Sequence, residues 1–161
     1  MTMTVRKQRT AGAGASVSGK GTGAGRFEEV FQRLRAILLR NTGRAGVRVK
    51  EDGPICYCLE GGIHPVRQTA FPIAWVKVAK AYVSFHHMAV YARPRLLEGV
   101  SKELKARMQG KACFNFKSVD PVLFAELEGL TARGFAAFQG TSFMSDDNSK
   151  KRKPNPDSIP Q

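Results

Sequence analysis

Apolar residues recur every three or four positions over residues 27–40, and this spacing predicts an amphipathic helix. Glu28 and Glu29 come early in the segment and Arg40 comes at its end, a charge order that the helix dipole favours. The Asn-Thr-Gly sequence at 41–43 predicts the end of the helix. Its buried stripe is predicted to consist of Phe27, Val30, Phe31, Leu34, Ile37 and Leu38.

Further along the chain, apolar and polar residues alternate with a period of two. Short strands are predicted at 47–50 and 55–59, separated by an Asp-Gly-Pro turn at 52–54. Residues 71–78 and 82–91 predict two more strands, in which successive side chains face opposite sides of the sheet. Because the connection between these two strands is short, we expect them to be antiparallel neighbours.

Caps and helix breakers organise the last part of the sequence. Residues 101–108 open with a serine ahead of an acidic turn and predict a helix, and residues 111–117 predict a strand. Asp120 directly before Pro121 predicts the start of a final helix, which Gly134 is expected to end. This order of elements predicts an α+β fold with a mostly antiparallel sheet covered on one face by helices.

Length and composition fit one folded domain. The chain has 161 residues and 42% hydrophobic residues, enough for one ordinary core and too few residues to argue for two domains. We predict the α+β domain at 27–143. The Gly/Ala/Ser-rich segment 1–26 and the polar segment 144–161 are predicted to be disordered tails, because neither could bury enough apolar surface to offset its ordering entropy.

The net charge of +13 favours loose association with polyanions. About half of the excess falls in the predicted domain, so the tails alone do not account for it. No apolar run reaches the roughly 18 residues that a membrane span needs, and the basic N-terminus lacks the hydrophobic core of a secretory signal. We therefore predict a cytoplasmic protein without membrane contact. The odd count of three cysteines predicts free thiols in a reducing compartment.

Several motifs resemble those of the YdhG-like family, a family of small domains of unknown function. The resemblance rests on a Gly-Pro turn before a Tyr-containing strand (53–57), on the paired strands around Trp75 and 82–86, and on the Gly-Lys step at 110–111 into an aromatic strand. It implies an α+β domain. Some members are described as frataxin-like iron chaperones, a role that requires acidic or His ligands. The matched region is basic and poor in carboxylates, so we assign no iron ligand.

The sequence offers little support for a metal or catalytic motif. His86 and His87 are neighbours on a predicted strand, so their side chains face opposite sides and cannot share one metal. Cys56 and Cys58 have C-x-C spacing, whereas structural zinc sites usually pair cysteines as C-x₂-C. The segment 14–20 imitates the start of a phosphate-binding loop but is followed by glycine where Ser or Thr should stand. We therefore predict no metal site, no cofactor and no enzymatic activity.

Two binding hypotheses remain, and the sequence leaves the oligomeric state open. The first is a non-enzymatic small-ligand or metal-handling accessory domain that uses a sheet face with Tyr57, Trp75, His86 and Lys111. The second is a nucleic-acid or polyanion binder that uses both tails and a basic surface formed by Lys105, Arg107, Lys111 and Lys117. In either case Phe114 and Phe116 share one strand face and are expected to belong to the core.

Overall fold

The computed structural model describes residues 25, 27–62 and 69–138. The two predicted tails, apart from Gly25, lie outside the described residues, as do the loop around His64 and the segment 14–20.

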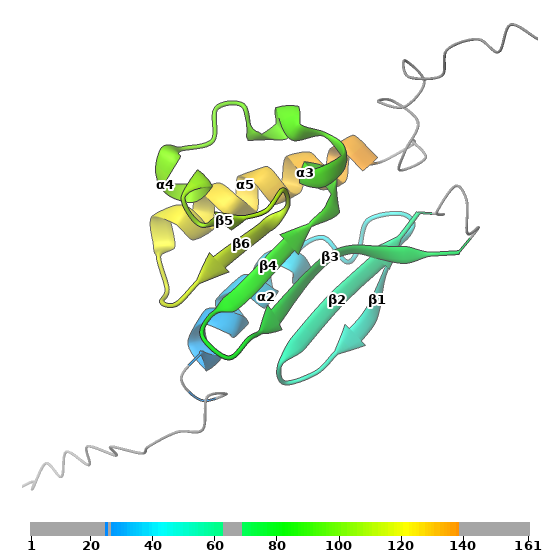
Figure 1. Cartoon of the computed structure of the whole chain (residues 1–161). Coiled ribbons are helices and arrows are strands. Elements are labelled where there is room, and N and C mark those ends of the chain that lie inside the picture. Colours follow the sequence, from blue (N-terminus) through cyan, green and yellow to red (C-terminus); the bar gives the residue numbers. More distant parts are fainter. Residues whose placement is uncertain (1–24, 26, 63–68, 139–161) are drawn as a thin grey trace, which may run out of the picture.

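Six strands form one sheet in which every neighbouring pair is antiparallel (Figure 1). Their order across the sheet is β1-β2-β3-β4-β6-β5, so the last two strands exchange places relative to the sequence. The predicted α+β class with an antiparallel sheet is confirmed. The strands are β1 (Val47–Asp52), β2 (Cys56–Gly61), β3 (Phe71–Val78), β4 (Val83–His87), β5 (Met108–Gln109) and β6 (Cys113–Phe116).

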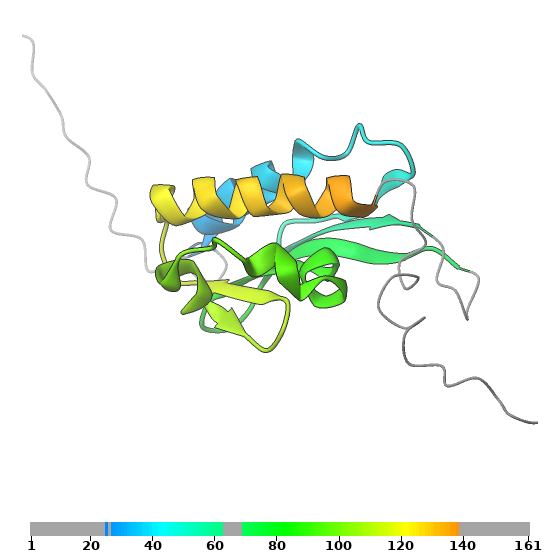
Figure 2. The same ribbon diagram turned by 90° about the horizontal axis from the view of Figure 1, so that it is seen from above.

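Two helices, α2 (Glu28–Leu39) and α5 (Pro121–Phe138), lie side by side over the same face of the sheet (Figure 2). An ion pair of 2.9 Å between Arg40 and Glu128 links them at the surface. The chain passes from β4 to β5 through three short elements, which are α3 (Met88–Ala92), the 3-10 helix η1 (Pro94–Leu97) and α4 (Lys102–Lys105).

The core lies between these two helices and the sheet. On the four inner strands of the sheet, β2, β3, β4 and β6, every second side chain points toward the helices, as the two-residue period predicts. The fully buried side chains on this face include Tyr57, Leu59, Ala74, Val76, Val83, Phe85, His87, Phe114 and Phe116. The helices contribute Phe31, Leu34 and Leu38 from α2 and Leu127 and Leu130 from α5. Burying one such large side chain stabilises the fold by about 1.5–3 kcal/mol.

Two predicted helix starts are confirmed by their hydrogen bonds. The hydroxyl of Ser101 accepts the backbone N–H of Leu104 at 3.1 Å, and the carboxylate of Asp120 accepts the N–H of Leu123 at 3.1 Å. The stripe predicted for residues 27–40 is also confirmed, since all six of its members are buried.

Three predicted boundaries were wrong. The strand predicted at 82–91 ends at His87, whose ring nitrogen Nδ1 accepts the N–H of Ala89 at 3.4 Å and thereby caps α3. The helix predicted at 101–108 is the short α4 alone, because Met108 pairs with Phe114 as part of β5. The final helix continues through Gly134 to Phe138.

Candidate ligand-binding face

The sheet face opposite α2 and α5 carries two cross-strand rows of polar, aromatic and sulfur-containing side chains. This face is turned toward the viewer in Figure 1. The pairing of β2, β3, β4 and β6 aligns Cys58, Trp75, His86 and Cys113, which we call the central row. The same pairing aligns Cys56, Lys77, Ser84 and Asn115, which we call the second row. Directly opposed side chains on one face of a sheet are neighbours, with Cβ atoms about 4.5–5.5 Å apart.

The ring of Trp75 is stacked on the ring of His86 in the middle of the central row. Their centroids are 4.4 Å apart and their planes differ by 10°. Both side chains are half-buried, and each stands on a central strand rather than at the edge of the sheet. The stack therefore fixes the orientation of the imidazole on one side.

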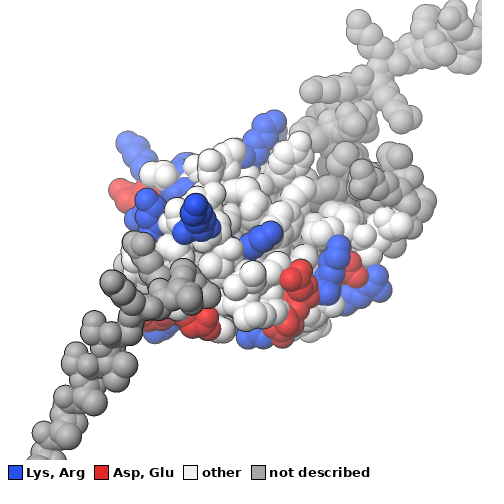
Figure 3. Space-filling model, turned by 60° about the horizontal axis from the view of Figure 1, so that its bottom comes forward, with Lys and Arg blue, Asp and Glu red and all other residues white. Residues whose placement is uncertain are grey.

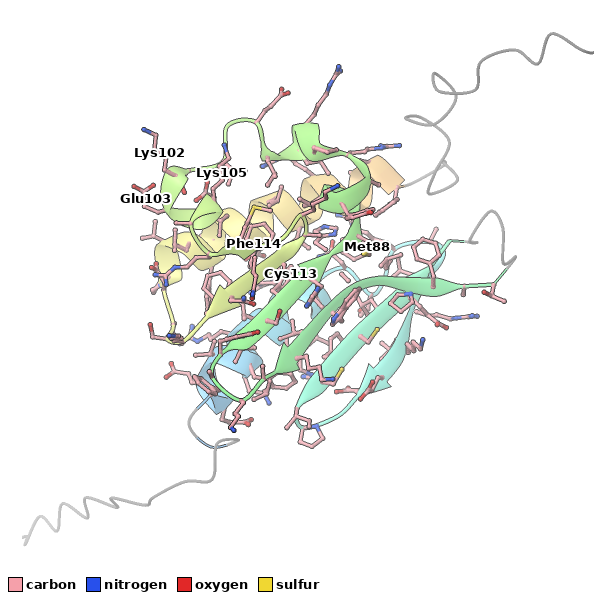
Figure 4. The ribbon with its side chains drawn as sticks, viewed as in Figure 1. Met88, Lys102, Glu103, Lys105, Cys113 and Phe114 are labelled. Atoms are coloured by element: carbon pink, nitrogen blue, oxygen red, sulfur yellow. The ribbon has the colours of Figure 1, made fainter. Side chains whose placement is uncertain are left out.

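The other contacts of His86 are polar. The sulfur of Cys113 lies 2.7 Å from Nδ1 of His86, and the hydroxyl oxygen of Ser84 lies 2.9 Å from Nε2. The same sulfur lies 3.4 Å from Nε2, so the thiol stands against the side of the ring, near both nitrogens, and not on the lone pair of Nδ1. Figure 4 labels Cys113 on β6, next to β4, and Phe114 beside it with its side chain in the core.

Burial controls the protonation of this pair. Burial lowers the pKa of His86 below its ordinary value of 6.5, and burial raises the pKa of Cys113 above its ordinary value of 9.0. At neutral pH the imidazole is therefore an uncharged base and the thiol keeps its proton. The two groups form a neutral donor–acceptor pair on the sheet surface.

The structure divides the four residues predicted for a ligand site. Trp75 and His86 are in contact, but Tyr57 is fully buried on the opposite face of the sheet, where the guanidinium of Arg35 lies 4.8 Å from its ring centroid. Lys111 is exposed in the turn between β5 and β6, and its ammonium lies 5.7 Å from the ring centroid of Tyr91. The predicted group of four therefore does not form one site.

Cys113 was not among the predicted site residues. The contact between Cys113 and His86 joins positions 27 residues apart in the sequence. It depends on the direct pairing of β4 with β6 in the sheet, although several short elements separate these strands along the chain. The alternation of β6 carried a partial signal, because Phe114 and Phe116 in the core place Cys113 on the other face. The strand order that sets it beside His86 cannot be read from that alternation.

The predicted basic surface is also divided. Lys105 belongs to α4, and Arg107 lies across from Asn115 through a backbone hydrogen bond of 2.9 Å, near Lys117 at the end of β6. Lys111 is at the opposite end of the β5–β6 hairpin. Figure 3 shows that on one side of the domain Asp and Glu side chains stand beside several of the Lys and Arg side chains. This side of the domain therefore carries charges of both signs and is not uniformly basic.

Metal-binding groups are sparse in the part of the chain that the structure describes. Within it, no three His, Cys, Asp or Glu side chains come together so that they could hold a metal ion. His86 and His87 face opposite sides of the sheet, as predicted, and His87 is fully buried under α5. The three cysteines are all free thiols.

Comparisons with known proteins give no family assignment. No family model, no curated protein and no solved structure matches this chain. Among the described residues, none of the helices has the length and apolar character required to cross a membrane.

Proposed function

We propose that this chain is a small-ligand-binding domain that holds a planar ligand on the open face of its sheet. The observation that supports this most is the stack of Trp75 and His86, which lies half-buried in the middle of a face that α2 and α5 leave free. Aromatic side chains bury large apolar area and offer ring faces to planar molecules.

The second row supplies the polar contacts that would orient such a ligand. Lys77 is exposed and pairs across the strands with Ser84, which in turn pairs with Asn115. The ammonium favours a ligand that carries an anionic group, and the half-buried amide of Asn115 can exchange hydrogen bonds with it. A few polar groups beside an apolar or aromatic surface are typical of ligand sites. The proposed class is therefore a planar ring system with an acidic substituent.

The test uses the fluorescence of Trp75, which is the single tryptophan of the chain. The full chain is titrated with a set of nucleoside monophosphates, which combine a planar base with a phosphate. Saturable quenching of the fluorescence is expected. The Trp75→Leu variant has no tryptophan, so its affinity is measured by calorimetry. It should bind about tenfold more weakly, because one aromatic stacking contact is lost. Lys77→Gln should weaken binding as well. The matched control is Tyr57→Phe on the opposite face, which should bind as the unaltered protein does.

The outcome against the proposal is the absence of saturable binding to this set, together with native mass spectrometry of protein purified gently from its own cells that shows no mass lost on denaturation. A bound mass that survives Trp75→Leu would also contradict the proposed face.

A second candidate function is binding of nucleic acid or another polyanion. The net charge of +13 and the position of Lys105, Arg107 and Lys117 near one end of the β5–β6 hairpin favour it. Such binding would fall steeply with salt, and Arg107→Glu or Lys111→Glu would weaken it. Affinity for a single-stranded oligonucleotide that does not change between low and high salt would argue against this function.

A further inference from the structure

Three side chains of the open face are arranged as a nucleophile, a base and a group that orients the base. The thiol of Cys113 contacts Nδ1 of His86 at 2.7 Å, and the hydroxyl of Ser84 contacts Nε2 at 2.9 Å. These groups come from two neighbouring strands, β4 and β6, so the backbone holds them in register. A nucleophile that touches a base, with the base fixed by a third group, is the arrangement that activates thiols and hydroxyls in covalent chemistry.

The imidazole of His86 is held on one ring face and at one ring nitrogen. Trp75 covers one face of its ring at a centroid distance of 4.4 Å, and Ser84 fixes the far nitrogen. Nδ1, the nitrogen that Ser84 does not contact, is the one nearer to the sulfur, at 2.7 Å against 3.4 Å for Nε2. Cys113 and His86 are both half-buried, so the pair is shielded in part and still open to a small molecule from the free side of the sheet.

We propose that Cys113 is a reactive thiol, activated by His86, that exchanges with small disulfides. In this step the sulfur of Cys113 attacks one sulfur of the disulfide while its proton passes to Nδ1 of His86. A bond forms between Cys113 and the attacked sulfur, and the original sulfur–sulfur bond breaks. The departing thiolate takes the proton from the imidazolium. Cys113 is oxidised to a mixed disulfide, one half of the reagent is reduced to a thiol, and no other oxidant is needed.

The surroundings favour a disulfide as the electrophile. Disulfide exchange requires loss of the thiol proton, access along the sulfur–sulfur axis and a proton for the leaving group. His86 would accept the thiol proton as the attack proceeds and return it to the leaving sulfur. Acyl transfer would also need fixed donors for an oxyanion. The exposed ammonium of Lys77, across from Ser84, favours disulfides that carry carboxylates.

The other thiols of the sheet provide an internal comparison. Cys56 is also half-buried, and burial and the neighbouring Glu51 raise its pKa to about 11. Burial raises the pKa of Cys58 and of Cys113 too, so the contact with an imidazole is what sets Cys113 apart. Cys58 is in the central row beside Trp75 and is 6% exposed. Neither has an imidazole in contact among the described residues. The proposal therefore predicts that one thiol of the three reacts first.

The experiment exposes the reduced full chain to oxidised glutathione and follows each cysteine by peptide mass spectrometry. At pH 7, Cys113 is expected to form the mixed disulfide about tenfold faster than Cys56 or Cys58. His86→Gln and His86→Phe should each lower the rate of Cys113 by about tenfold or more at pH 7, since a positioned base contributes at least this much. His86→Phe keeps an aromatic ring against Trp75, so it separates the loss of the base from the loss of the stack.

The pH profile distinguishes activation from packing. At pH 10 hydroxide forms the thiolate without help, so the rates of the unaltered protein and of both variants should converge. A rate of Cys113 at pH 7 that is unchanged in both variants would overturn the proposal. Equal losses at pH 7 and pH 10 would do the same, because they would show a change of access alone. Ser84→Ala should lower the rate less than the loss of His86 does, as a positioning residue would.

This site does not depend on the proposed function. A chain that binds no nucleoside monophosphate can still show fast exchange at Cys113, and Trp75→Leu can abolish ligand binding while the pair of Cys113 and His86 remains. Circular dichroism and urea unfolding establish for each variant that the fold is retained before rates are compared.

Discussion

Gly134 of α5 lies directly against the imidazole of His87. A Cβ atom at Gly134 would stand 2.7 Å from Cε1 of His87 and 3.0 Å from Cβ of Ala89, distances at which something must move. The ring also contacts the backbone of the helix, with Nε2 3.2 Å from the carbonyl oxygen of Thr131. Glycine in the middle of a helix is normally a cost, and here it allows the ring to reach the helix backbone.

We expect Gly134→Ala to destabilise the domain by about 1–3 kcal/mol, the usual cost of forcing an extra carbon into a well-packed core. Its helix propensity alone would act in the opposite direction. The free energy of unfolding in urea measures the difference.

Gly129→Ala is the matched control in the same helix. Its added Cβ would lie 3.6 Å from the end of the flexible Arg133 side chain, an ordinary contact distance, so this substitution should stabilise the domain by about 0.5–1 kcal/mol. Equal effects of the two substitutions would refute the close packing of His87 on Gly134.

His87 should make the domain less stable in mild acid. Burial lowers the pKa of this fully buried imidazole from 6.5 to about 4, against the smaller opposite effect of the carbonyl groups of Thr131 and Ile73. Below pH 6.5 the unfolded chain binds a proton that the folded chain refuses. Stability is therefore complete above pH 6.5 and falls as the pH decreases toward 4, by roughly 3 kcal/mol in all.

Urea unfolding between pH 7.5 and pH 4.5 tests this dependence, and His87→Gln should flatten it, because the amide can keep hydrogen bonds without titrating. Burial lowers the pKa of His86 too, so His86→Gln is the matched comparison and should remove a smaller part of the dependence. An unfolding free energy that stays constant across this range in the unaltered protein would rule out a buried neutral His87.

Tyr57 carries a buried hydroxyl that has no hydrogen-bond partner among the described residues. An unsatisfied buried hydroxyl costs about 1–3 kcal/mol, whereas the ring keeps its packing and its contact with Arg35 when the oxygen is removed. Tyr57→Phe should therefore leave the domain as stable as before or stabilise it by up to about 1 kcal/mol. A loss of more than that in urea unfolding would mean that the hydroxyl is bonded in solution.

Ser101 connects α4 to α5 through Glu126. Its backbone N–H and its hydroxyl donate to the two carboxylate oxygens of Glu126, each at 2.6 Å, and these donors lower the pKa of Glu126. The same hydroxyl caps α4 at the N–H of Leu104. Ser101→Ala should cost about 0.5–2 kcal/mol of unfolding free energy.

Ser118→Ala is the control for this substitution, since Ser118 is exposed and should change stability by less than about 0.5 kcal/mol. If the two alanine variants unfold at the same urea concentration, the link between Ser101 and Glu126 contributes nothing in solution.

The sequence predicted those features that depend on local spacing. The stripe of α2 follows from a period of three to four residues, the opposite directions of His86 and His87 follow from the strand period, and the cap at Asp120 follows from its position before Pro121. Each of these features depends on residues that belong to the same helix, the same strand or the same cap.

The missed features depend on contacts between distant segments. Gly134 reads as a helix end until His87 is known to pack on it. The contact of Cys113 with His86 belongs to the same class. The place of Tyr57 on the helix side of β2 was open to prediction, because it shares a face with Leu59 in an alternating strand.

The two outer strands have a consequence for assembly. At one border of the sheet, β5 offers a ladder of two residues, too short to recruit a foreign strand firmly. At the other border, β1 carries the charged residues Arg48, Lys50 and Glu51 and an irregular register between Val49 and Glu51. Short, charged or bulged borders discourage sheets from joining edge to edge. The domain can thus leave the sheet face opposite α2 and α5 without cover from any helix of the described residues, and the sheet still does not become a template for fibril growth.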